Sequence, residues 1–220
     1  KNMKHLTLLL LLFPFLTLSQ DINNVDINGY KQGKWLKKHN NGNIKYKGQF
    51  TDDKPFGLFY YFYENGKLKA EKKFFHNGQA ASTHFYDKSG NLKSSGIYVN
   101  ELKDSTWNYY NSDSIIIMSE QYNKGLLNGF TKTYYYDGSI FEIKSWLDNN
   151  LDGPWKQFFI DGSIQMESSF KNNERNGNHI SYHPNGKIYF QGLYKEDIKS
   201  GVWEYFNSDG VIDTLINYNE

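Results

Sequence analysis

From residue 29 onward, the same pattern of apolar and polar positions returns every 24 residues. Each unit has a small residue, a strand-like run that ends near an aromatic residue, a turn pair that is Asx-Gly in six of the eight copies, and a second strand-like run. No insertion or deletion interrupts the eight copies, so one supersecondary unit is repeated in tandem. The turn glycines are Gly42, Gly66, Gly90, Gly138, Gly162, Gly186 and Gly210, with Ser114 at the remaining position.

Three rows of apolar residues keep a fixed distance from these turns. Asn-Gly or Asp-Gly between two strand-like runs is a strong signal for a β-hairpin. The sequence therefore predicts an all-β fold in which eight tandem β-hairpins form an elongated antiparallel meander over residues 29–220. The rows are Ile44, Leu68, Leu92, Ile116, Ile140, Ile164, Ile188 and Ile212; Phe50, Phe74, Tyr98, Tyr122, Trp146, Phe170, Tyr194 and Tyr218; and Phe62, Tyr86, Tyr110, Tyr134, Phe158, Tyr182 and Phe206.

The parity of the strands favours a three-residue turn with glycine in the left-handed position, as Pro184 before Asn185-Gly186 also indicates. In that register the Ile44, Phe50 and Phe62 rows share one face. The opposite face would carry a second row, in which five rings could form a binding strip or pack under the loops. This row consists of Trp35, Phe59, Trp107, Trp155 and Trp203, with Thr83, Thr131 and His179 at the other positions, and a basic row of Lys45, Lys69 and Lys93 lies beside it.

The first residues have a different pattern. A basic start, an apolar run from Leu6 to Leu18 and a small-residue exit at Ser19 predict a cleaved signal peptide over residues 1–19, as a helix, followed by a linker over 20–28. The run is short for a membrane span, which needs about 20 residues. The sequence thus predicts an exported protein that is periplasmic, on the outer surface or secreted.

Charge and composition exclude several classes of function. Without residues 1–19 the chain has 23 basic and 24 acidic side chains, so a nucleic-acid partner is not expected. There is no cysteine, and the sequence has no nucleotide-binding or hydrolase fingerprint. His179 and His183 lie four apart in a strand, where this spacing does not suit a metal site as it would on a helix. We therefore predict no enzyme activity, catalytic residue, cofactor or metal.

The unit resembles the bacterial variant of the MORN repeat. The resemblance rests on a glycine followed two residues later by an aromatic, then Tyr-Tyr or Phe, Asn-Gly-Lys, an aliphatic and a terminal aromatic, and it covers residues 29–220. The segments Gly57 to Phe74, Gly129 to Trp146, Gly153 to Phe170 and Gly177 to Tyr194 match best, whereas Ala81, Ser105 and Ser114 depart from the pattern. Proteins of this kind are often assigned to the YwqK-type antitoxin family, which implies a partner-neutralising protein.

Three functions follow from these features. The first is an exported scaffold that binds a protein partner along its sheet, with an antitoxin or immunity protein as one form, because Tyr and Trp are favoured at interfaces. The second is binding to membrane phospholipid through Lys45, Lys69 and Lys93. The third is binding to cell wall or carbohydrate through the tryptophan row.

Overall fold

A computed structural model describes residues 22–219, so the predicted signal peptide and the start of the predicted linker lie outside the described residues. The described chain forms one antiparallel sheet of 18 strands without a helix. The strands are β1 (Asn24–Val25), β2 (Lys31–Lys38), β3 (Ile44–Thr51), β4 (Lys54–Phe62), β5 (Leu68–Phe75), β6 (Ala80–Tyr86), β7 (Leu92–Val99), β8 (Leu102–Tyr110), β9 (Ile116–Asn123), β10 (Leu126–Tyr134), β11 (Ile140–Leu147), β12 (Asn150–Phe158), β13 (Ile164–Lys171), β14 (Glu174–Arg175), β15 (Gly177–Tyr182), β16 (Ile188–Lys195), β17 (Ile198–Phe206) and β18 (Ile212–Asn217).

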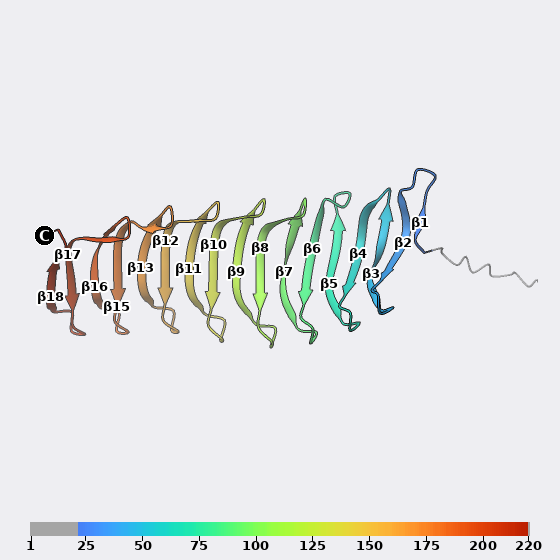
Figure 1. Cartoon of the computed structure of the whole chain (residues 1–220). Helices are drawn as coiled ribbons and strands as arrows, with labels where there is room; N and C mark the ends of the chain where they lie inside the picture. The colour runs from blue at the N-terminus through green and yellow to red at the C-terminus, as the bar shows by residue number, and fades with distance from the viewer. Residues whose placement is uncertain (1–21, 220) are drawn as a thin grey trace, which may run out of the picture.

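Strands that follow one another along the chain pair, except that β13 pairs with both β14 and β15. The row of hairpins makes an elongated sheet with bowed strands (Figure 1). The predicted antiparallel meander is therefore confirmed. The short strand β1, which pairs with β2, falls within the segment expected to be a linker. Within residues 22–219, no helix is long and apolar enough to cross a membrane.

The Asx-Gly turns have the predicted three-residue form. In the first hairpin, the His39 N–H donates to the Asn43 carbonyl at 2.8 Å, and the Gly42 N–H donates to the His39 carbonyl at 3.0 Å. Gly42 has a φ of 86°, in the left-handed region. Ser114 occupies the same position with a φ of 63°, so the turn survives without its glycine.

The predicted faces are wrong, because each hairpin contains a second bulge just after the turn. Lys38 pairs with Ile44 as expected, but Lys37 pairs with Tyr46, which leaves an extra residue on the second strand. This extra residue inverts the parity of the rest of the strand. Phe50 consequently pairs with Gly33 and lies on the same face as Trp35, at 5.9 Å between ring centroids. The Phe50 and Trp35 rows thus share one face, and the Ile44 and Phe62 rows lie on the other.

At the opposite edge of the sheet, hairpins are joined by tight turns with two residues in the left-handed region. Asp52 and Asp53 have φ values of 49° and 61°, and Asn172 and Asn173 have 52° and 73°. These values are those of a type I′ turn, whose twist matches the flanking strands. In several of these turns the second residue also forms hydrogen bonds with the backbone of the preceding hairpin, as Asp53 does with Lys31 and Asn173 with Leu151. These hydrogen bonds link successive units.

The third unit departs from this plan at Ala81. The small residue near the start of the first strand has positive φ in the other seven units, including Ser105 at 58°. Alanine disfavours that conformation, and β5 and β6 pair without any register shift. The surplus residues lie instead in the loop between Phe75 and Ala80. The sequence signalled an irregular unit here but not where its surplus residues would go.

Candidate functional site

Nearly all buried side chains lie on one face of the sheet, the face of the Trp35 and Phe50 rows, which we call the inner face. Phe59, Trp107 and Trp203 are each only 1 % exposed. In a single-layered sheet, side chains can be buried to that degree only on the face toward which the strands curl. The inner face is therefore the hydrophobic core as well as the hollow side of the molecule.

The floor of this face is built by pairing large rings with small residues. A β-carbon added to Gly48, Gly96 or Gly192 would lie 2.2–2.4 Å from the ring of Phe59, Trp107 or Trp203, respectively. A long side chain holds the glycine position at three places, and at two of them a threonine replaces the ring, in the pairs Lys72–Thr83 and Glu120–Thr131. At the third place, Lys144 pairs with Trp155 and the ring is kept. Sequence reasoning missed this rule, although the signal was present as a glycine eleven residues before each of these rings.

A second layer of rings and cations covers this floor. Phe74, Tyr98 and Tyr194 contact the buried rings edge to face, with centroids 4.9–5.1 Å apart. The Lys103 ammonium lies 4.8 Å from the Trp107 ring centroid, and the Lys199 ammonium lies 4.1 Å from that of Trp203. Cations over aromatic faces are stabilised by the ring quadrupole. The inner face therefore presents tyrosine edges and ammonium groups to solvent.

Tyr109 and Tyr122 join this layer to an acidic group. Both hydroxyls donate to Oε2 of Glu120 at 2.6 Å, and the Lys103 ammonium donates to the Tyr109 hydroxyl at 2.6 Å. Burial, assisted by the hydrogen bond to Glu120, raises the pKa of Tyr122 to about 12 and that of Tyr109 still further. Burial also lowers the pKa of Lys103. The tyrosines stay neutral near pH 7 and act as hydrogen-bond donors.

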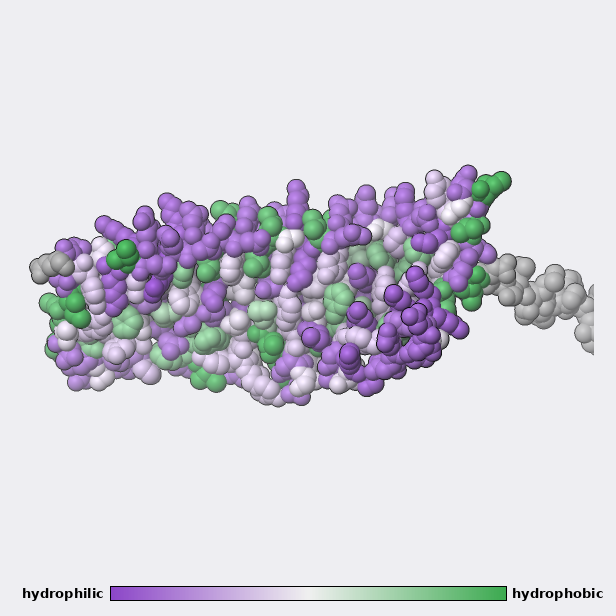
Figure 2. Space-filling model, in the orientation of Figure 1, coloured by the Kyte–Doolittle hydropathy of each residue, from purple (hydrophilic) through white to green (hydrophobic). Residues whose placement is uncertain are grey.

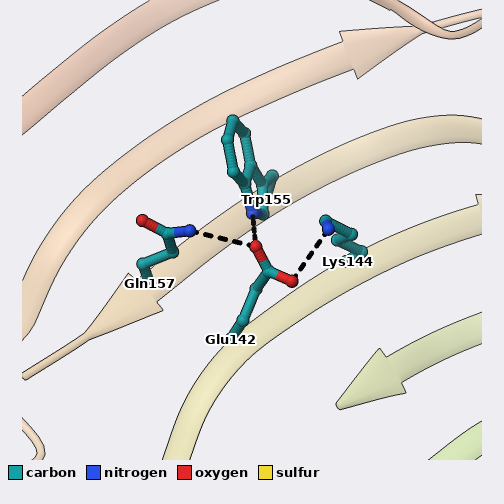
Figure 3. A network of polar contacts seen from close by, with 4 residues as sticks. All are labelled: Glu142, Lys144, Trp155 and Gln157. Carbon is teal, nitrogen blue, oxygen red and sulfur yellow. Dashed lines mark hydrogen bonds and ion pairs between the residues drawn. The ribbon is translucent and has the colours of Figure 1, made fainter. Parts of the chain in front are cut away.

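A similar closed network surrounds Glu142 on the inner face (Figure 3). Its carboxylate accepts from Trp155 Nε1 at 2.8 Å and from Gln157 Nε2 at 3.0 Å, and it pairs with the Lys144 ammonium at 2.8 Å. Burial alone would raise the pKa of Glu142, but these donors outweigh it and lower the pKa. Because both carboxylate oxygens are engaged, the network fixes the Trp155 ring and has a structural role.

The structure divides the predicted site residues into three groups. Phe59, Trp107 and Trp203 are buried in the floor, whereas Trp35 and Trp155 are half-buried. The seven predicted turn glycines all lie in the Asx-Gly turns with positive φ. The basic row is exposed beside those turns and consists of Lys45, Lys69 and Lys93.

Sequence reasoning missed that the inner face is basic. The chain is nearly neutral overall, and many acidic residues lie in the turns at the two edges of the sheet. The upper edge in Figure 2 is mostly hydrophilic. The charged side chains that meet inner-face rings or networks are mostly cations: Lys31, Lys72, Lys103, Lys144, Arg175 and Lys199, against Glu120 and Glu142. No group of three or more metal-ligating side chains occurs within residues 22–219.

Comparison with known families finds a match for four of the units. Four segments of the chain match the MORN repeat variant, at residues 31–52, 57–77, 151–172 and 175–196. These MORN segments fall in the first two and in the sixth and seventh units. The unmatched stretch between them contains the irregular residues Ala81, Ser105 and Ser114. The match confirms the resemblance to the MORN repeat variant at four units.

No curated protein matches the sequence. Among solved structures, a chain of the GtfA/B complex bound to UDP and GlcNAc is 12 % identical, with a TM-score of 0.23. That match covers 54 % of this chain and 22 % of the other, so this chain spans well under two thirds of the related structure. Nothing about fold or function follows from a similarity of this degree.

Proposed function

We propose that the protein is an exported scaffold that binds a protein partner on its inner face. MORN repeats generally act as scaffolds for protein or membrane interactions, and they are not known as enzymes. One observation carries the proposal. The inner face exposes tyrosine edges and cations over a rigid floor of buried rings, and aromatic residues and arginine are enriched at protein interfaces.

The rigid floor supports binding in a second way. Rings that are already ordered lose little conformational entropy when a partner docks on them. Trp35, Phe59, Trp107, Trp155 and Trp203 thus act as the floor and anchor of the surface, while Lys103, Lys199 and the tyrosines around them make the contacts. An antitoxin or immunity role is the specific form that we propose for this scaffold.

Matched substitutions on the two faces test the proposal. Lys103→Gln with Lys199→Gln removes two inner-face cations, and Lys34→Gln with Lys73→Gln removes two exposed lysines from the outer face. We expect the wild-type chain and the outer variant to retain one stoichiometric partner from the exported fraction at physiological salt, and the inner variant to lose it. Equal recovery by both variants, or no partner at all, contradicts the proposal.

A separate experiment tests the antitoxin role. Co-expression of the chain with a toxin-like protein encoded beside it should restore growth, and the inner-face variant should fail to do so. Restored growth with the inner variant would place the contact elsewhere on the protein.

Phospholipid binding is a second candidate, because Lys45, Lys69 and Lys93 are all exposed and line one edge of the first three units. Anionic headgroups attract such rows. Liposomes with anionic lipid should then sediment the wild-type chain but not a variant with glutamine at the three positions. Glycan binding through the tryptophan row would use Trp35 and Trp155, whose rings are part-exposed, and a Trp155→Ala variant on a glycan array tests it.

A further inference from the structure

The inner face contains a cavity of about 540 Å³ that extends across strands β3 to β7. Pockets for small ligands are typically of about 300–1,000 Å³ and are mostly lined by apolar and aromatic side chains. The walls of this cavity include the rings of Phe50, Phe59, Tyr61, Phe74 and Tyr98, and Lys72 lies among them. The cavity therefore has the size and lining of a ligand site.

The irregular third unit borders this space. Its residues Gly78, Gln79, Ala80 and Ala81 line the cavity, and Ala81 stands where the other units have glycine or serine. Gly78 in the displaced loop lies against Pro55, where an added β-carbon would be 2.8 Å from the proline Cδ. The loop thus closes one end of the cavity, which is specific to this place in the sheet.

Lys72 is half-buried in the cavity and points its ammonium at two rings. Its Nζ lies 4.8 Å from the Tyr98 ring centroid and 5.9 Å from that of Tyr61. Within residues 22–219, its ammonium makes no hydrogen bond or ion pair. Burial lowers the pKa of Lys72, against an opposing attraction from Glu101 at the rim. Aromatic faces compensate only part of the hydration that a buried ammonium loses.

Four other inner-face cations are better satisfied. Lys144 pairs with Glu142 at 2.8 Å, and Arg175 pairs with Asp197 at 2.7 Å. Lys103 and Lys199 donate to tyrosine hydroxyls. The Lys72 ammonium, in contrast, has no protein acceptor for its N–H donors among the described residues, and it lines the cavity. Because the walls nearest to it are aromatic, the acceptor for its ammonium is either water in the cavity or a group on a bound ligand.

We propose that this cavity binds a carboxylate that carries an aromatic or branched apolar group. The carboxylate accepts from the Lys72 ammonium, and the apolar group packs between the rings. Glu101 is exposed at the rim and repels the anion, so the carboxylate has to enter toward Lys72. A small acid alone would occupy this site, so its binding can be measured without the protein partner proposed above, although Phe59 belongs to both surfaces.

Two probes of the same shape test the proposal on the wild-type chain. N-acetylphenylalanine has the carboxylate, and N-acetylphenylalaninamide replaces it with a neutral amide. A hydrogen bond to a charged group is worth about 1.5–3 kcal/mol, so the acid should bind about tenfold tighter or more in an NMR titration. A hexapeptide that ends in phenylalanine with a free carboxylate shows whether the source is a polypeptide, because it should then bind tighter than the single residue.

Two substitutions that should change the affinity for the acid in opposite directions test the roles of Lys72 and Glu101. Lys72→Met should weaken binding of the acid about tenfold without changing that of the amide, whereas Glu101→Gln should strengthen binding of the acid. Lys69→Met, which removes an exposed lysine outside the cavity, is the matched control and should bind as wild type does. Equal affinity for acid and amide on the wild-type chain overturns the proposal without any variant. Unchanged binding of the acid by a folded Lys72→Met variant also overturns it.

Discussion

The indole ring of Trp107 lies directly on the backbone of Gly96 in the neighbouring strand. A β-carbon at Gly96 would be 2.3 Å from Cδ2 of Trp107, and Trp107 Nε1 donates to the carbonyl of Ile97 at 3.0 Å. The ring is 1 % exposed. Glycine is therefore required here for space, since Gly96 does not have positive φ.

Gly96→Ala should consequently destabilise the protein by overpacking, by about 1–3 kcal/mol. The midpoint of urea unfolding measures the loss. In a Trp107→Ala background the ring is gone, so the same Gly96→Ala change should cost much less. If the cost is the same in both backgrounds, the contact with the ring is not its cause.

The 24-residue period of the sequence was sufficient to predict the fold, but it was not sufficient to predict which residues share a face of the sheet. Turn glycines at constant spacing, with Gly42 in the left-handed region as expected, predicted the hairpins and their order. The second strand of the hairpin has one extra residue, Lys45, opposite Lys37 and Lys38. One extra residue moves all following side chains of that strand to the other face, so the parity of every second strand was inverted. Nothing in the local sequence of Lys45 marks that bulge.

The candidate sites were predictable only in part, for the same reason. The aromatic rows were visible in the sequence, but the inner-face cations Lys72, Lys103 and Lys199 could be grouped only once the faces were known. The cavity beside Lys72 depends on where the third unit places its surplus residues. Ala81 signals an irregularity, and only the pairing of β5 with β6 shows its location.

The turn at Ser114 offers a stabilising substitution. Ser114 has a φ of 63° at a position where seven other units have glycine. A non-glycine residue in the left-handed region is strained by about 1 kcal/mol or more. Ser114→Gly should therefore raise the free energy of unfolding by roughly 0.5–1 kcal/mol, with the greater freedom of glycine in the unfolded chain offsetting part of the gain. Gly138→Ser, the reverse change one unit later, should lower the free energy of unfolding. If both variants raise it, or both lower it, this explanation is contradicted.

Asn173 links two hairpins at the other edge. Its Oδ1 accepts from the Leu151 N–H at 2.8 Å, and its φ is 73°. Asn173→Ala removes the acceptor and strains the backbone, so we expect a loss of about 1–2 kcal/mol in unfolding free energy. Asn173→Gly removes the same side-chain hydrogen bonds, including the one from Nδ2 to Asn150 Oδ1, without straining the backbone and should lose less. Asn173→Asp keeps the acceptor for Leu151 and should retain most of the stability. Equal losses for alanine and glycine would assign the whole effect to the hydrogen bond.

His179 makes the inner face sensitive to acid. The ring is 6 % exposed, stacks on Phe190 with centroids 5.5 Å apart, and lies 5.9 Å from Trp203. Burial, reinforced by the charges of Arg175 and Lys199, lowers the pKa of His179 from 6.5 to about 4. The folded state thus holds the neutral imidazole, while the unfolded chain takes up a proton below its ordinary pKa.

The stabilisation that depends on neutral His179 is complete above pH 6.5 and decreases as the pH falls toward 4. Between these limits the loss should be on the order of 3 kcal/mol. Urea unfolding at pH 7 and at pH 4.5 measures it, and His179→Phe should reduce the difference between the two pH values. His183, whose Nε2 contacts the Phe206 carbonyl at 3.0 Å at the sheet edge, supplies the control. His183→Gln should keep the acid sensitivity of the wild type; if it removes that sensitivity as fully as His179→Phe does, His179 is not the group responsible.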